Sequence, residues 1–360
     1  MAKFYYGGQA VIEGVMMRGQ RHVAVAVRAP DGRIVLHEEP LRGVLTHPVM
    51  KLPFLRGLLG LWDALGLGMK ALMFAANVAM EEEEKAEQAK QNVEQGLQGA
   101  AATTVLPTAP IAIEGSGSRV ESAQPGDEKK PFSGATAWTS ILFALALMVG
   151  IFFVLPVLAA SFITGLANSH SNVAHNVIEG AIRLSLFIGY IWLIGRMPDI
   201  KRVFGYHGAE HKTINAYEAG AELTPERVQS FTLLNPRCGT TFLLIVLLLA
   251  TLVFIVIGKL PFVLMVLSRI VLVPVIATIA YEFIRLMANL YDRAVIRAIM
   301  APGLALQKMT TRQPDPSMLE VAIVALRAVL VADGVLRSEQ TASPGPQSRE
   351  DAVEPATTLA

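Results

Sequence analysis

The chain has 360 residues, 52% of them apolar and 7% aromatic, and its 31 basic and 30 acidic side chains give a formal net charge of +1. This apolar content and the positive mean hydropathy are higher than in ordinary soluble domains, so the sequence excludes that class of protein. The balanced charge offers no basic excess for nucleic acid, and we expect no nucleic-acid partner. The single cysteine, Cys238, excludes a disulfide within the chain.

The N-terminal section, residues 1–50, has the pattern of a small β module. An extended apolar stretch is interrupted by Gly14, and two further apolar runs flank an Ala-Pro-Asp-Gly turn at 29–32. Proline presets φ in such a turn and glycine accepts positive φ. We expect two or three antiparallel strands. Glu13 and Arg18 are the candidate residues if this Gly-rich segment contributes to a functional site.

Residues 51–80 form a long apolar segment that nevertheless contains Arg56, Asp63 and Lys70. Each of these charges is costly at the centre of a bilayer. Because they recur every seven residues, they lie near one face of a helix. An amphipathic helix in the cytoplasmic membrane interface is therefore expected in preference to a further span.

Two segments have the composition of disordered chain. Residues 81–136 begin as a charged helical extension and then become rich in Ser, Pro and Gly, and residues 335–360 form a disordered tail. The segment 285–334 before this tail is expected to be helical and cytoplasmic. In it, Ser317 and Glu320 form a capping box that opens a helix, and an Asp-Gly pair closes that helix.

Four apolar runs approach or reach the roughly 20 residues that a membrane-spanning helix needs. A core helix of a soluble protein could imitate one such run, but four in one chain make that a poor explanation. The predicted fold is an α-helical integral membrane protein with four transmembrane helices, a membrane domain at 137–284. The predicted spans are 138–163, 178–195, 241–258 and 261–283.

The basic residues predict the orientation of these spans. Residues 164–182 contain no Lys or Arg, whereas the loop 196–240 contains several. Under the positive-inside rule, this loop and both termini are cytoplasmic, in a multi-pass protein of the cell membrane. Cys238 then lies on the reducing side.

The loop carries the sequence His207-Gly-Ala-Glu210-His211. Residues four apart stack on one helix face, so both imidazoles can reach one ion. This H-x-x-E-H order is a zincin signature in which the histidines bind zinc and the glutamate acts as general base. We expect a short helix from about Tyr206 to Ala219 that stops at Gly220. The alternative is two surface histidines with a solvated glutamate.

A zinc site needs a third protein ligand. Cys238 is the leading candidate because a thiolate binds zinc strongly and a Pro/Gly turn presents it; otherwise it is a small buried residue at the start of a span. Glu218 lies too far along the helix to share the ion. Weaker candidates are Asp199, Glu222 and Glu226.

Two functions remain open. The first is a metal-dependent, hydrolytic enzyme at the cytoplasmic membrane face, with a divalent metal (zinc) on His207, His211 and Cys238 and with Glu210 as the catalytic base. The second is a non-enzymatic membrane scaffold or assembly factor, with a structural metal or none. Expected partners are the lipid bilayer and either other membrane proteins or further copies of the chain. Arg269 and Glu282 lie within a predicted span but too far apart to pair, and two charges do not make a transport pathway.

Five short motifs occur in order along the chain, at 7–19, 206–212, 236–240, 302–307 and 310–312. Together they resemble the YqhQ-like family of bacterial membrane proteins. The resemblance covers nearly all of the chain outside the linker and the tail. It implies a largely uncharacterised membrane protein labelled a metal-dependent enzyme on the same histidines. The family pattern has His-Pro-Arg-Cys-Gly where this chain has Asn235, so no ligand role is expected at that position.

Overall fold

The structure is a computed structural model that describes residues 6–41, 55–100, 120–122, 135–168, 171–258 and 260–336. The predicted disordered tail beyond Leu336, and the parts of the predicted linker at 101–119 and 123–134, lie outside the described residues.

The N-terminal strands form an antiparallel meander, and a short strand from the linker region joins its edge in parallel. Two or three strands were predicted, whereas the N-terminal part has four. The reason is that the stretch broken at Gly14 is itself a hairpin, with Glu13 at a φ of 51° in its turn. The strands are β1 (Gly7–Val11), β2 (Gly14–Arg18), β3 (His22–Arg28), β4 (Ile34–Pro40) and β5 (Val120–Ser122).

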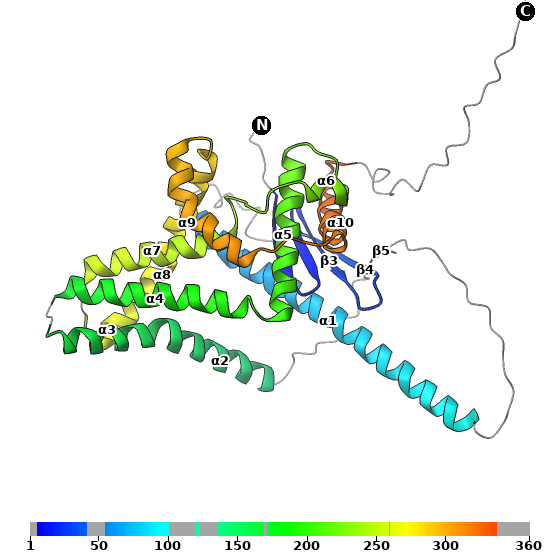
Figure 1. Ribbon diagram of the computed structural model, residues 1–360, viewed down its shortest axis with the longest axis horizontal. Helices are drawn as coiled ribbons and strands as arrows, with labels where there is room; N and C mark the ends of the chain where they lie inside the picture. The colour runs from blue at the N-terminus through cyan, green and yellow to red at the C-terminus, as the bar shows by residue number, and fades with distance from the viewer. Residues whose placement is uncertain are drawn as a thin grey trace, which may run out of the picture.

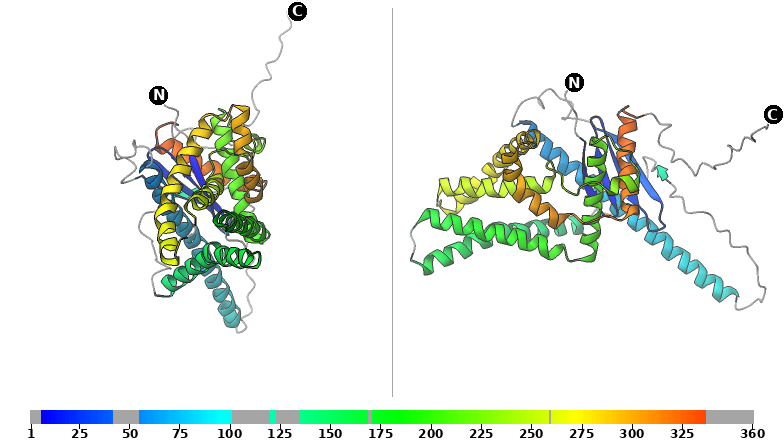
Figure 2. Two further views of the ribbon diagram at one scale, coloured as in Figure 1. Left: turned by 90° about the vertical axis from the view of Figure 1, so that its left-hand side faces the viewer. Right: turned by 45° about the horizontal axis from the view of Figure 1, so that its top comes forward.

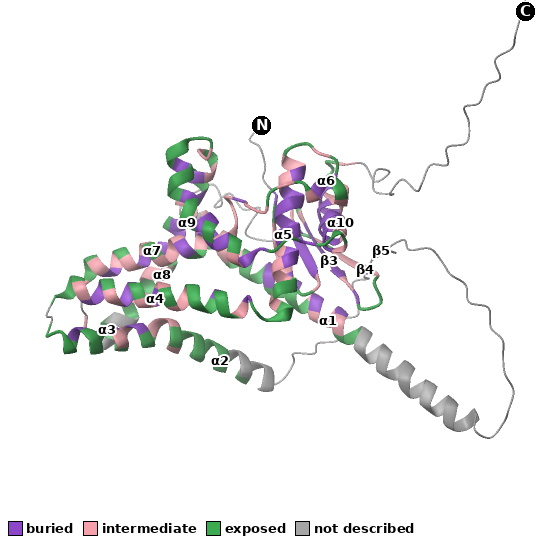
Figure 3. Ribbon diagram, viewed as in Figure 1, coloured by how far each residue is buried: buried purple, intermediate pink, exposed green. Residues whose placement is uncertain are grey.

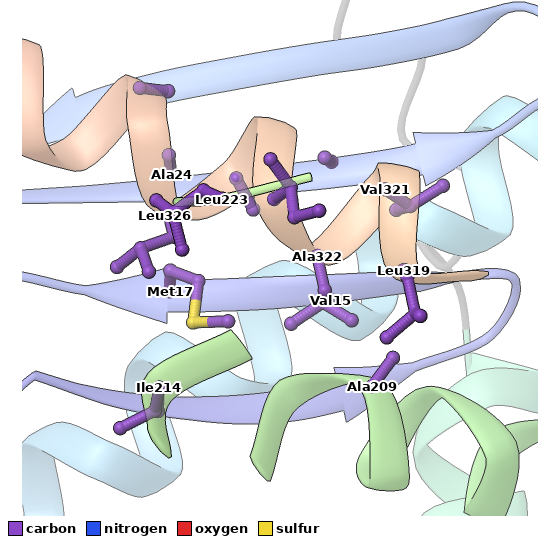
Figure 4. Close-up of a cluster of buried hydrophobic side chains, with 14 of the residues drawn as sticks. Val15, Met17, Ala24, Ala209, Ile214, Leu223, Leu319, Val321, Ala322 and Leu326 are labelled. Carbon is purple, nitrogen blue, oxygen red and sulfur yellow. The ribbon is translucent and has the colours of Figure 1, made fainter. Parts of the chain in front are cut away.

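The sheet is covered on both faces, which explains the uninterrupted apolar run Val-Ala-Val-Ala-Val in β3. Helix α1 (Leu55–Ala100) packs on the face that carries the valines. Helices α5 (Pro198–Glu218) and α10 (Pro316–Ala332) pack on the face that carries the small alanines, where a helix can approach closely (Figure 4). We call this sheet with α1, α5 and α10 the α/β module.

Helix α10 belongs to the core of the α/β module, although it is almost 300 residues from β3 in sequence. Leu319 and Leu326 are fully buried, and each contributes about 1.5–3 kcal/mol by leaving water. The helix begins two residues before the predicted position. Its N-cap is Asp315, whose side chain accepts a hydrogen bond from the Met318 N–H, and Ser317 donates to that same carboxylate.

The remaining long helices form an apolar bundle beside the α/β module (Figures 1 and 2). At one end of the bundle α3 and α7 end and α4 and α8 begin, while the module lies at the other end (Figure 1). Two smaller helices, α6 (Pro225–Gln229) and α9 (Ala294–Thr310), lie between bundle and module in sequence. The bundle consists of α2 (Ala135–Val149), the π-helical turn η3 (Gly150–Val154), α3 (Leu155–Leu166), α4 (Asn172–Ile194), α7 (Gly239–Ile257) and α8 (Phe262–Asn289).

Five helices are long and apolar enough to cross a membrane, one more than the four predicted spans. The additional one is Arg56–Glu81 in α1, the segment that the sequence analysis assigned to the interface. The other four agree with the prediction in position, and their outward surface is largely exposed and apolar (Figure 3).

Charges inside the bundle are paired with each other. The Glu179 carboxylate on α4 accepts hydrogen bonds from Arg183, one turn away, and from Arg269 on α8 at 2.7 Å. Arg269 and Glu282 do not pair with each other, as expected from their separation; Glu282 binds Arg56 of α1 instead. A buried ion pair is tolerated in an apolar setting only with such compensation.

Candidate metal centre

The predicted histidines lie on α5, where the α/β module meets the apolar bundle (Figure 1). The helix begins at Pro198, eight residues earlier than predicted, because the Pro-Asp pair there is a favourable first turn. It ends beside Gly220, which has a φ of 70°, as predicted. His207 and His211 therefore share one face of a continuous helix, with ring centroids 4.4 Å apart.

Both imidazoles are oriented by the backbone. His207 Nδ1 donates to the Thr310 carbonyl oxygen at 2.8 Å, and His211 Nδ1 donates to the Leu233 carbonyl oxygen at 2.5 Å. A carbonyl can only accept, so each Nδ1 carries the proton and each Nε2 presents its lone pair. A histidine that binds a metal is held in this way, with its second nitrogen fixed by a hydrogen-bond acceptor.

Cys238 completes the group. It caps the N-terminus of α7, and its Sγ lies 3.2 Å from His207 Nε2. One nitrogen of each histidine and the Cys238 Sγ all lie within 4.8 Å of one another. His211 Nε2 is buried and has no hydrogen-bond partner among the described residues. A buried nitrogen without a partner destabilises the fold unless a hydrogen-bond donor or a cation binds it. Two imidazoles and one thiolate are ligands that zinc prefers.

Glu210 lies beside these donors rather than in solvent. Its Oε2 is 3.9 Å from His207 Nε2 and 3.7 Å from His211 Nε2, and its side chain is buried. Burial raises the pKa of Glu210 to about 7, although the nearby His207 and the Gly8 N–H oppose this shift. The alternative of surface histidines with a solvated glutamate is therefore incompatible with the structure.

The N-terminal strand β1 covers this carboxylate. The Gly8 N–H donates a hydrogen bond to Glu210, and a Cβ on Gly8 would lie only 2.6 Å from Glu210 Cγ. The two candidate residues of this segment, Glu13 and Arg18, do not reach the candidate metal donors. Glu13 binds Arg202 on α5, and Arg18 pairs with Asp63 on α1.

The chain at and just after the end of α9 also contacts the centre. A Cβ on Gly208 would lie 2.0 Å from the Arg312 carbonyl oxygen, so only glycine allows this close approach, and the Thr310 carbonyl two residues before Arg312 accepts the hydrogen bond of His207. Residue-by-residue reasoning did not single out these positions. The only signal for them was the match of segment 310–312 to the YqhQ-like pattern.

A buried amide fixes the loop that presents Cys238. Gln307, which is fully buried, accepts a hydrogen bond from the Asn235 N–H and donates to the Asn235 carbonyl and to Thr241. The Asn235 side chain is itself buried and accepts from the Arg237 N–H, closing the turn before the cysteine. Asn235 therefore shapes the loop and takes no part in the donor group.

The other predicted ligands do not join the donor group. Among the described residues, the group consists of the two histidines and Cys238, without Asp199, Glu222 or Glu226. Glu218, which was excluded by distance, instead binds Arg237 near the Cys238 turn.

Comparison with known proteins places this chain in a family. The family model described as a protein of unknown function, DUF1385, matches residues 52–332. The "Uncharacterized protein YqhQ" of Bacillus subtilis (strain 168) is 32% identical over 344 residues, which cover 94% of this chain and 96% of that protein. No solved structure matches the chain. The resemblance to the YqhQ-like family is thus confirmed, and the chain belongs to the DUF1385 family of proteins of unknown function.

Proposed function

We propose that the protein is a metal-dependent enzyme, hydrolytic in type, at the cytoplasmic face of the cell membrane. The observation that carries this proposal is the convergence of His207, His211 and Cys238 with both Nδ1 atoms already committed to backbone carbonyls. Two histidines that are simply exposed on a helix face need no fixed tautomers. They also would not leave a ring nitrogen buried without a hydrogen-bond partner, as His211 Nε2 is here.

Each residue has a defined role in this proposal. His207, His211 and Cys238 hold the cation, which would supply Lewis-acid polarisation of a substrate oxygen. Glu210 is adjacent to both Nε2 atoms, so its Oε2 is placed to accept the proton of an attacking water. Gly8 holds the carboxylate from the β1 side, and Thr310 and Leu233 orient the rings.

The membrane location follows from the bundle. Its helices are long and apolar enough to span, and the ends that carry the α/β module are flanked by the basic residues of the 196–240 loop. The positive-inside rule assigns that side, with both termini, to the cytoplasm. The metal centre then lies where the bundle meets the cytoplasmic module.

The first test is metal content, by mass spectrometry on the detergent-purified chain without a histidine tag. We expect about one equivalent of zinc in the parent, lost in both His207→Ala and His211→Ala. Glu210→Gln is the matched variant because it keeps the shape of the side chain while removing the base. It should retain metal and lose turnover in a panel of ester, phosphoester and amide substrates. A well-folded parent that binds no metal would exclude the proposal.

A second function, a scaffold or assembly factor with a structural metal, is favoured by one specific observation. The Glu210 carboxylate lies close enough to both imidazoles to serve as a fourth donor, and four protein donors close a zinc site. Its partners would be membrane proteins or further copies of the chain. Cobalt substitution separates the two functions. An enzyme with an open position should change its visible spectrum when azide or thiocyanate is added, whereas a closed structural site should not.

A further inference from the structure

The exposed side of α1 carries a continuous apolar stripe. Trp62 is 78% and Leu65 is 63% exposed, and the large exposed residues recur at intervals of three and four as far as Met73 and then after seven at Met80, as on one face of a helix. The stripe extends for about 33 Å at helical rise. An exposed helix face of a soluble protein is normally polar, and a patch of this extent marks an interaction surface. Its large members are Leu58, Trp62, Leu65, Met69, Leu72, Met73 and Met80.

The remaining sides of α1 are occupied within the chain. Leu67, Ala71, Ala75 and Val78 pack on the valine face of the sheet. At the start of the helix Gly57 fits against Thr278 and Tyr281 of α8, so no second apolar face is left for burial.

The charged residues of α1 lie beside the apolar stripe, not within it. Between residues 55 and 80 the charged residues are Arg56, Asp63 and Lys70. Arg56 Nε lies 2.6 Å from Glu282 Oε1, Asp63 Oδ2 lies 3.3 Å from Arg18 Nη2, and Lys70 Nζ lies 3.1 Å from Glu39 Oε1. The Arg56 and Asp63 side chains are mostly covered by these contacts, whereas Lys70 remains exposed. A helix side that faces water would carry charged residues at its centre, so a stripe without charge indicates that this side of α1 meets an apolar medium.

The sheet excludes a spanning position for α1. The middle of α1 packs on strands whose rim carries exposed charges, including those of Asp31 and Glu38. An open sheet edge with such residues cannot lie in hydrocarbon, because its backbone groups would lose their hydrogen bonds. The part of α1 beneath the sheet must therefore remain outside the bilayer core.

We propose that the apolar stripe of α1 lies in the surface of a lipid bilayer and anchors the α/β module there. The neighbouring helix favours lipid over a protein partner. The helix on which α1 packs, α8, itself exposes Val275, Ile279 and Leu286, so a candidate span beside the stripe is apolar on its outer surface as well. The stripe ends at Met80, and the four carboxylates of Glu81-Glu-Glu-Glu84 that follow would be repelled by an anionic membrane surface, so the contact with lipid ends there.

The proposal does not depend on the metal centre being catalytic. It does have a consequence for that centre, because Gly68 of α1 lies against Gln9 of β1, next to the Gly8 that contacts Glu210. Anchoring α1 therefore holds β1 and the Glu210 carboxylate at a fixed distance from the bilayer surface.

Tryptophan fluorescence of the full chain in proteoliposomes tests the proposal. The chain has three tryptophans, so Trp138→Phe with Trp192→Phe leaves the native Trp62 as the single reporter and changes nothing in the stripe. Trp62 should be quenched more by lipids brominated near the headgroup end of the acyl chain than by lipids brominated near its methyl end, at the depth of about 5–10 Å expected for an interfacial helix.

Two reference variants, each carrying Trp62→Phe and a single new tryptophan, calibrate the depth. Leu248→Trp, on the exposed side of α7, reports the bilayer interior, and Val335→Trp, exposed after α10, reports water. If Trp62 is quenched as deeply as the Leu248 reporter, α1 is a span. If no brominated lipid quenches it, the stripe is covered by protein or by water, and acrylamide separates these two cases. Either result overturns the proposal.

Discussion

Gly8→Ala is the substitution that tests most directly whether β1 closes the metal centre. A Cβ at this position would lie 2.6 Å from Glu210 Cγ and 2.9 Å from the Met16 carbonyl oxygen, and the second atom belongs to the backbone and cannot rotate away. Overpacking of this kind costs about 1–3 kcal/mol. The matched control is Gly7→Ala, because nothing lies within 4 Å of a Cβ at the neighbouring glycine.

The assay combines thermal unfolding in detergent with competition for zinc against a fluorescent chelator. Gly8→Ala should lower both stability and zinc affinity, whereas Gly7→Ala should be neutral. In a Glu210→Ala background the penalty of Gly8→Ala should shrink by about 1–2 kcal/mol, because the nearest clashing atoms have been removed. If Gly8→Ala behaves like Gly7→Ala in both measurements, β1 does not lie against Glu210 and our account of the centre is wrong.

Three further predictions concern the bundle, the supporting loop and the metal. Glu179→Leu should destabilise the protein by about 3–5 kcal/mol, because Arg183 and Arg269 would share no carboxylate; unchanged unfolding in detergent would contradict this pairing. Gln307→Leu breaks three buried hydrogen bonds and should cost about 3 kcal/mol, with weaker zinc binding. The pairing of Gln307 with the cysteine loop is refuted if zinc affinity stays at the parent value. Adding a chelator should lower the unfolding temperature of the parent but not of His211→Ala, since only a chain that binds the metal gains stability from it; an equal decrease in both would place the metal elsewhere.

The sequence was sufficient for the features that depend on local spacing. Two histidines four positions apart must share a helix face, so their approach could be predicted without knowing what surrounds them. Cys238 was identified from its chemistry and its turn, and it lies with the histidines. Four of the five candidate spans were likewise evident, since length and apolar content alone define such a helix.

The seven-residue spacing of charges in α1 is an intermediate case. It correctly indicated that Arg56, Asp63 and Lys70 face one way, but it could not show what they face. Arg56 and Asp63 have partners that are distant in sequence, so only the folded chain reveals that these two charges are covered by protein while Lys70 stays exposed beside Glu39. The apolar side of the same helix is consequently the exposed one, and this fact led to the proposal of a membrane-surface anchor.

What surrounds the metal centre was decided by tertiary structure alone. Gly8, Leu233 and Thr310 contact the histidine motif from three different parts of the chain, through backbone groups that every residue type possesses. No side-chain chemistry in the sequence marks a carbonyl that will orient an imidazole. The association of α10 with the β module could not be predicted either. Its apolar faces are buried against a sheet nearly 300 residues earlier in the chain, and local sequence patterns do not reveal such a long-range contact. The sequence determined which atoms could bind a metal, and the fold determined that they point at one another.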